Sequence, residues 1–363
     1  MPRATTAHIR ADNLRHNLGI ARSRAPGAQV MAVVKADGYG HGLERVAQAL
    51  EGADLYGVAA LADAERLRAA GLSQPIVLLS GFDSPEDLAH LRQLDVATVV
   101  HSHEQLRMLE AAGPGEPIRC WLKVDSGMHR LGFAPGQVRE AHTVLASLPH
   151  VAGEIALMTH FASSDEYADS PSRGKQTLEQ LRTFEEATAG LPGPRSLANS
   201  AAVLGWPQAH GDIVRPGGML YGMSVVDGAS GDAFGLRPAM DFCTKLIAVN
   251  RFAKGEPIGY SATWRCPEDM PVGVAAVGYG DGYPRVVPPG TPVLVNGRRA
   301  SVIGRVSMDL MTIDLRTQPD ARVGDPVLLW GEGLPVETIA AAAGTIGYEL
   351  VCSITRRVRF VED

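Results

Sequence analysis

The sequence predicts an α/β protein with an N-terminal (β/α)8 barrel and a C-terminal domain made mostly of β-strands. The chain of 363 residues, 45% of them hydrophobic, is longer than one core usually supports. Short apolar runs alternate with helical patterns up to about residue 218, and strands without long helices follow after about residue 239. We therefore expect a barrel domain over residues 1–238, with the extreme N-terminus as a candidate to pair with the other domain, and a β domain over residues 239–363.

The apolar runs of the first part are rich in Val, Ile and Leu, and most are followed by a stretch with helical spacing. Strands that are apolar on both faces indicate a parallel sheet covered by helices, and eight such units favour a closed barrel over an open doubly wound sheet. The predicted strands are Val30–Lys35, Leu55–Leu61, Pro75–Leu79, Val96–Val100, Arg119–Asp125, Gly153–His160, Arg195–Asn199 and Asp212–Arg215. The predicted helices include Leu43–Leu50, Ala62–Ala70, Pro85–Leu94, His103–Ala111, Pro135–Ser147 and Lys175–Ala189.

The second part of the chain contains turn signals, among them Asn296-Gly297 at a predicted hairpin tip. One short helix is predicted over Glu337–Ala343, and a last strand is predicted near Cys352–Phe360. The other predicted strands are Phe242–Asn250, Val272–Val277, Pro292–Val295, Arg299–Ile303, Met311–Leu315 and Pro326–Trp330.

Composition and charge argue against several classes of partner. The net charge of -6 is spread along the chain without a basic block, so we expect no nucleic-acid binding. No apolar run reaches the roughly 20 residues of a membrane helix, and the first residues lack the apolar segment of a signal peptide. We expect a soluble cytoplasmic protein with free cysteines and, because no His, Cys or carboxylate cluster has ligand spacing, no metal site.

Polar residues follow several of the predicted barrel strands. Lys35 closes an apolar strand, where its ammonium would point into the barrel mouth; desolvation there would lower its pKa and free an amine for covalent chemistry. The alternative is a lysine whose stem merely covers apolar surface. The glycines of residues 38–42 do not have the spacing of a dinucleotide site. Other residues at strand ends are Lys123, Asp125, His160, Asn199, Ser200 and Arg215.

The pair Gly217-Gly218 follows the last predicted barrel strand. Without side chains, its backbone N–H groups could approach a phosphate, at the place where barrels of this type commonly bind one. A flexible loop is the alternative reading of the same two glycines.

Six segments resemble, in order and spacing, the pattern of the alanine racemase family, whose members are fold-type III pyridoxal-phosphate enzymes. The segments are AVVKADGYGHG (32–42), KVDSGMHRLG (123–132), MTHF (158–161), ANSAA (198–202), VRPGGMLYG (214–222) and GRVSMD (304–309). Each motif alone is weak, whereas the set covers nearly the whole chain. The resemblance implies pyridoxal 5'-phosphate as cofactor and the conversion of L-alanine to D-alanine (EC 5.1.1.1), for peptidoglycan or for D-alanine breakdown.

The resemblance also implies roles for individual residues. Racemisation needs a base on each face of the substrate; Lys35, which would also hold the cofactor, is one, and Tyr260 from the second subunit of a homodimer is the other. Arg215 would face the pyridine nitrogen, and His160 would connect Arg215 to Tyr260. Further cofactor contacts would come from Tyr39, Asn199, Ser200, Gly217, Gly218 and Tyr221, and contacts to the substrate carboxylate from Arg130 and Met308.

Three positions qualify the resemblance. Gly218 stands where relatives commonly have an apolar branched residue, and Arg356 stands where several have a phosphate-contacting tyrosine. Lys123 matches a lysine that is often carbamylated in relatives, where the resulting anion orients Arg130. Because the resemblance implies that position 356 helps to line the pocket, a broader racemase of serine and other small amino acids is an alternative.

Two other classes of protein share parts of this pattern. A fold-type III decarboxylase has both domains but usually places a carboxylate where this chain has Arg215. A non-catalytic pyridoxal-phosphate carrier normally has the barrel alone, without a domain that bears Tyr260.

Overall fold

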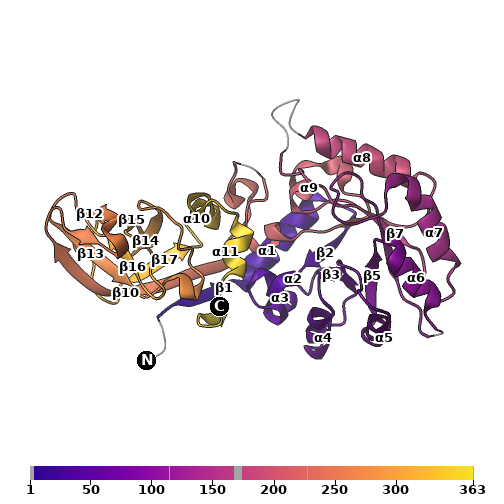
Figure 1. Cartoon of the computed structure of the whole chain (residues 1–363), viewed down its shortest axis with the longest axis horizontal. Coiled ribbons are helices and arrows are strands. Elements are labelled where there is room, and N and C mark those ends of the chain that lie inside the picture. The colour runs from indigo at the N-terminus through magenta and orange to yellow at the C-terminus, as the bar shows by residue number, and fades with distance from the viewer. Residues whose placement is uncertain (1–3, 114, 167–173, 227, 363) are drawn as a thin grey trace.

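The computed structural model describes residues 4–113, 115–166, 174–226 and 228–362, so the outermost residues of the expected domains, Met1 and Asp363, lie outside the described residues. Figure 1 shows a ring of strands surrounded by helices, and beside it an elongated body made mostly of strands. The predicted fold class is confirmed.

The barrel contains eight parallel strands in the described part of the chain, in the order β8-β7-β6-β5-β4-β3-β2-β9. A parallel bridge between Asn199 and Arg215 closes the ring beyond β8 and β9. Side chains such as Met31, Val99 and Trp121 form one buried cluster, as expected of a filled barrel interior. The strands are β2 (Gln29–Val33), β3 (Leu55–Val58), β4 (Ile76–Leu78), β5 (Val96–Val100), β6 (Cys120–Lys123), β7 (Ala156–Met158), β8 (Arg195–Ser196) and β9 (Ile213–Val214).

Helices cover the outside of this ring (Figure 1). They are α1 (Ala11–Arg24), α3 (Leu43–Ala49), α4 (Leu61–Ala69), α5 (Pro85–Leu94), α6 (His103–Ala111), α7 (Val138–Ser147), α8 (Lys175–Thr188) and α9 (Ser200–Gly205). Helix α1 is not among the helices predicted from the sequence. Its buried face contains the polar Asn17, whose side chain donates to the carbonyl oxygens of Leu220 (2.9 Å) and Arg237 (2.8 Å). A polar residue on the inner face interrupts the apolar periodicity that marks a helix in sequence.

The second sheet has the order β13-β16-β15-β14-β17-β10-β1-β18, and β10 also pairs with β13. Asn296 and Gly297 both have positive φ between β14 and β15, which confirms the predicted hairpin tip. The strands are β1 (Thr6–Ile9), β10 (Met240–Phe252), β13 (Met270–Ala275), β14 (Pro292–Val295), β15 (Arg298–Ile303), β16 (Met311–Asp314), β17 (Pro326–Trp330) and β18 (Arg359–Glu362). A separate small hairpin joins β11 (Pro257–Ile258) and β12 (Trp264–Arg265).

Strand β1 lies in this second sheet, antiparallel to β10 and parallel to β18, although it comes first in the chain. Two helices, α10 (Val336–Ala343) and α11 (Gly347–Cys352), precede β18. The predicted last strand over Cys352–Phe360 is therefore wrong in its first part, because Cys352 ends α11 and the strand begins at Arg359. A short apolar run such as that around Leu350 is compatible with either a strand or a buried helix turn, and only packing decides between them.

Candidate active site

A cavity of about 1010 Å³ opens where the barrel strands end. Barrel enzymes have their active sites at the carboxyl ends of the strands, because loops that follow different strands meet there. Most of the residues predicted for the site line this cavity: Lys35, Tyr39, Lys123, Arg130, His160, Asn199, Ser200, Arg215, Gly217 and Gly218.

Lys35 leaves the barrel through a left-handed turn. Strand β2 ends at Val33, and α2 (Lys35–Tyr39) has positive φ from Ala36 to Tyr39. This conformation costs about 1–2 kcal/mol for each residue that is not glycine, so it needs support from its surroundings. Asp37 supplies support by accepting the N–H of Leu43 (3.1 Å) and by pairing with Arg66 (2.7 Å). The turn carries the chain away from the strand and leaves Lys35 at the rim of the cavity.

The lysine amines of the cavity are held by their surroundings in a state closer to neutral. Desolvation by the enclosing protein lowers the pKa of Lys35, and the positive charges of Arg130 and Arg215 lower it further. Burial, followed by the charges of Arg215 and Arg130, lowers the pKa of Lys123 to about 8. Such a concentration of cations favours anionic ligands, for example a phosphate, a carboxylate or a carbamate.

Arg215 is the most deeply buried of these cations, with 4% of its surface exposed. Its guanidinium donates to the carbonyl oxygens of Thr159 (2.7 Å) and Leu197 (3.2 Å) and to the hydroxyl of Ser196 (2.8 Å). All three acceptors are uncharged, so they fix the position of the guanidinium without neutralising it. Burial lowers its pKa to about 10, which leaves Arg215 charged at neutral pH.

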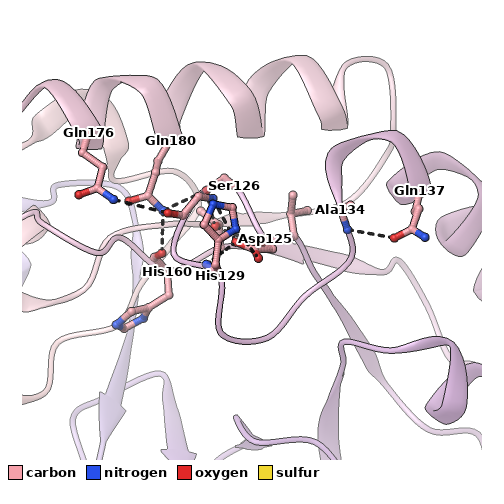
Figure 2. Close-up of polar contacts among 11 residues, drawn as sticks. Asp125, Ser126, His129, Ala134, Gln137, His160, Gln176 and Gln180 are labelled. Atoms are coloured by element: carbon pink, nitrogen blue, oxygen red, sulfur yellow. Dashed lines mark hydrogen bonds and ion pairs between the residues drawn. The ribbon is translucent and has the colours of Figure 1, made fainter.

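His160 is positioned from behind by helix α8. Gln180 donates to the carbonyl oxygen of His160 (3.1 Å) and accepts the N–H of Ala162 (2.9 Å), and it also donates to the hydroxyl of Ser126 (3.4 Å). Figure 2 shows Gln180 between the segment of Ser126 and that of His160, with the imidazole of His160 turned away from helix α8. Burial and the nearby charge of Arg215 hold the pKa of His160 well below its usual value, so the imidazole is neutral at neutral pH.

The backbone around Gly217 forms a cradle in the wall of the same cavity. The hydroxyl of Ser200 accepts the N–H of Gly217 (2.7 Å) and of Met219 (3.4 Å). A Cβ atom at position 217 would lie only 2.5 Å from the hydroxyl oxygen of Tyr39, so a side chain there would fill the space. Asn199 caps α9 by accepting the N–H of Ala202 (3.1 Å), which fixes the start of that helix beside the cradle.

Three predicted site residues are not among those that line the cavity. Tyr221 packs behind Tyr39, with ring centres 4.6 Å apart, and donates to the carbonyl oxygen of Val33 (3.2 Å), so it supports Tyr39 from the core. Tyr260 and Met308 lie on the second sheet and are 64% and 51% exposed. Tyr260 adjoins the β11–β12 hairpin, and Figure 1 shows β12 at the end of that body remote from the barrel.

The residues of the cavity wall that were not predicted from sequence include Tyr348 and Cys352 of α11. One signal was available: a glycine at position 218 implies that another group occupies the space of the missing side chain. Arg356, in contrast, is exposed and is not part of the wall.

The described residues show no metal-binding group of three or more His, Cys, Asp or Glu side chains. None of the helices in the described ranges combines the length and the hydropathy that a membrane crossing requires.

The fold and the cavity define a class of protein: a two-domain barrel enzyme with a cation-rich site at the carboxyl ends of its strands. Residues 9–225 match the model of the alanine racemase N-terminal domain, and residues 239–362 match the model of the alanine racemase C-terminal domain. The chain belongs to the alanine racemase family.

Individual relatives are similar over almost their entire length. The chain is 53% identical over 353 residues to an alanine racemase of Nitrosococcus oceani and 51% identical over 352 residues to one of Shewanella loihica, in both cases covering 97% of each chain. Its structure is similar to that of the biosynthetic alanine racemase of Pseudomonas aeruginosa, with a TM-score of 0.95, 45% identity and 99% of each chain covered.

Proposed function

We propose that this protein is an alanine racemase that interconverts L- and D-alanine with pyridoxal 5'-phosphate as cofactor. The observation that carries the proposal is the placement of Lys35, an amine with a lowered pKa, in one cavity with the charged and buried Arg215. The relatives compared above are named alanine racemases, which supports the same activity for this chain.

The residues of the cavity fit the cofactor by their chemistry. The cradle offers the N–H of Gly218 and the hydroxyls of Tyr39 and Ser200 to a phosphate, in a space that a side chain at Gly217 would fill. We assign the covalent attachment to Lys35, whose lowered pKa increases the fraction of reactive neutral amine. When bound, pyridoxal 5'-phosphate supplies an electron sink that makes the α-proton of an amino acid labile.

We assign Arg215 to the pyridine nitrogen. Because its guanidinium is buried and keeps its charge, it disfavours a second positive charge on that nitrogen. A cofactor held in this way would supply a weaker electron sink, which would favour the return of the proton to the α-carbon over transamination. A decarboxylase of this fold type usually places a carboxylate there, so Arg215 argues for the racemase.

The two bases act from opposite faces of the substrate. Lys35 is the base on one face, and in the described part of the chain no tyrosine of the second sheet lines the chain's own cavity. We assign the other face to Tyr260 of a second copy, with the neutral His160 between Tyr260 and Arg215, and we assign Met308 of that copy and Arg130 to the substrate carboxylate.

An exposed apolar surface on the second sheet supports a homodimer. Tyr279 and Met308 lie side by side, since the N–H of Gly280 donates to the carbonyl oxygen of Met308 (2.9 Å). Arg305 donates to the hydroxyl of Ser261 (3.4 Å), which joins this region to the turn that carries Tyr260. Tyr260, Tyr279, Met308 and Leu310 are all exposed in one chain. A surface of this composition is typical of an interface.

We place the enzyme in the cytoplasm, where its product would serve peptidoglycan synthesis or where D-alanine would be broken down. All four cysteines, Cys120, Cys243, Cys266 and Cys352, are free in the structure. Unpaired thiols are typical of a reducing compartment.

The first test is the loss of optical purity of L-alanine with the protein loaded with pyridoxal 5'-phosphate, run beside L-serine, L-lysine and L-ornithine. We expect alanine to racemise fastest. If alanine stayed L while another amino acid racemised or lost carbon dioxide, the substrate assignment would be wrong.

The second test addresses the shared site. Lys35→Ala and Tyr260→Phe should each be inactive alone, whereas a mixture allowed to exchange subunits should regain about one quarter of the wild-type activity, because half of the dimers are hybrids with one intact site. Lys35→Ala should also lose the absorbance of lysine-bound cofactor. A mixture without activity would contradict the assignment of Tyr260 to the partner.

A further inference from the structure

Helix α11 brings a tyrosine to the glycine cradle. Tyr348 lines the cavity, and a Cβ atom at Gly218 would lie 2.4 Å from its hydroxyl oxygen and 2.6 Å from its nearest ring atoms. Since real Cβ atoms essentially never approach other heavy atoms so closely, the position of Tyr348 and any side chain at 218 exclude one another. The side chain of Tyr348 can therefore occupy this position only because residue 218 is a glycine.

The hydroxyl groups of Tyr348 and Tyr39 both lie next to the glycine cradle. The hydroxyl of Tyr39 lies over Gly217 as that of Tyr348 lies over Gly218, and the two ring centres are 5.8 Å apart. Among the described residues, neither hydroxyl has a hydrogen-bond partner within the chain. Two neighbouring hydroxyl groups over two consecutive glycines thus face the same space without an acceptor.

Both phenols are protonated at neutral pH, because desolvation by the surrounding protein raises the pKa of Tyr39 and of Tyr348. They are donors that need an acceptor, since enclosed polar groups in proteins are nearly always hydrogen-bonded. A phosphate dianion has three oxygens that can accept several such bonds at once, and charge-assisted bonds of this kind are strong.

We propose that Tyr348 is a second phenolic ligand of the cofactor's phosphate group, beside Tyr39, and that Gly218 admits it. The inference rests on the proposed function, because it takes pyridoxal 5'-phosphate as the ligand of the cavity. It also accounts for both departures from the family pattern. Arg356, at the position where several relatives have a phosphate-contacting tyrosine, is exposed and outside the cavity wall, and Tyr348 of α11, eight residues earlier in the chain, provides a hydroxyl instead.

The test compares the binding of two cofactor forms to the cofactor-free full-length protein. Tyr348→Phe keeps the ring and removes the hydroxyl, and the titrated ligands are pyridoxal 5'-phosphate and pyridoxal, which lacks the phosphate; binding is followed by absorbance. We expect Tyr348→Phe to weaken the binding of pyridoxal 5'-phosphate by roughly 10-fold or more, which is the usual effect of losing one hydrogen bond to a charged group. The binding of pyridoxal should be unchanged.

Three further variants complete the design. Gly218→Ala should displace Tyr348 and weaken the binding of pyridoxal 5'-phosphate to a similar extent. The double variant Gly218→Ala/Tyr348→Phe should bind the cofactor only slightly more weakly than either single variant, because both changes remove the same contact. Tyr283→Phe is the matched control: it removes a buried hydroxyl in the segment between β13 and β14, outside the cavity wall, and should bind both ligands like the wild type.

The outcomes separate this inference from the proposed function. If the wild-type protein binds the cofactor through Lys35 and Tyr348→Phe binds it equally well, Tyr348 is not a phosphate ligand. Equal weakening of pyridoxal and its phosphate would also overturn the inference, since the hydroxyl would then act elsewhere. A wild-type protein that binds neither ligand would instead refute the proposed function.

Discussion

His41 gives the stability of this protein a specific dependence on pH. The residue is 1% exposed, the Nδ1 of its ring lies 2.7 Å from the carbonyl oxygen of Tyr39, and the ring centre is 4.8 Å from that of Tyr221. Burial lowers its pKa from 6.5 to about 4. The unfolded chain therefore binds a proton on this residue below about pH 6.5, whereas the folded protein binds it only near pH 4.

The sign of the effect follows from this difference. The stabilising effect of a neutral His41 is fully present above pH 6.5 and is lost as the pH falls toward 4, because protonation then favours the unfolded chain. A tenfold change in an equilibrium corresponds to about 1.4 kcal/mol, so the two pKa values imply a loss of about 3 kcal/mol in total and about 2 kcal/mol between pH 7 and pH 5.

The assay is urea unfolding of the wild type and of His41→Phe at pH 7 and pH 5, at fixed protein and cofactor concentrations, since bound ligand changes apparent stability. The phenylalanine keeps an aromatic ring against Tyr221 and cannot titrate. The free energy of unfolding should fall between the two pH values by about 2 kcal/mol less in the variant than in the wild type. His90→Gln, on the exposed face of α5, should keep the wild-type difference. An equal fall in the wild type and in His41→Phe would refute the reasoning.

Three other predictions concern positioning, stability and metals. Gln180→Leu removes the hydrogen bonds that position His160 and should lower kcat/KM for L-alanine by roughly 10- to 100-fold, because a displacement of about 1 Å in an active site has effects of this size. The control Gln137→Ala, at an exposed position (Figure 2), should retain activity. Unchanged activity of Gln180→Leu would show that His160 needs no such support. Asn17→Leu leaves backbone groups of Leu220 and Arg237 unpaired and should lower the free energy of unfolding by about 2–4 kcal/mol, as measured by thermal unfolding. A nearly unchanged stability would contradict this prediction. Incubation with a metal chelator should leave the racemisation rate unchanged, and a lost rate would require a metal in the reaction.

Much of the barrel could be predicted from sequence because its strands are short, apolar on both faces and separated by helices with clear spacing. Residues Val96–Val100, all buried in the structure, are an example. The residues that follow such strands gather at one rim for a topological reason, so the common location of Lys35, His160 and Arg215 could be expected from the sequence. The covalent order of the chain determines these features.

Other features depend on contacts between distant parts of the chain. The pairing of β1 with β10 and β18 joins the two ends of the sequence, and the short apolar run that forms α11 looks the same in sequence as a strand. Helix α1 was missed because Asn17 is buried through hydrogen bonds to residues more than 200 positions away.

The site itself divides in the same way. Sequence alone predicted that Lys35, Arg215 and the glycine pair lie at one site, since each follows a recognisable strand, and the resemblance to the family implied the role of Tyr260. Only the tertiary structure decided that Tyr260 is remote from its own barrel and that Tyr348 occupies the space above Gly218. Local patterns record which face of an element is buried, whereas the partner that covers a face, or the side chain that fills a gap, is determined by packing between elements far apart in the sequence.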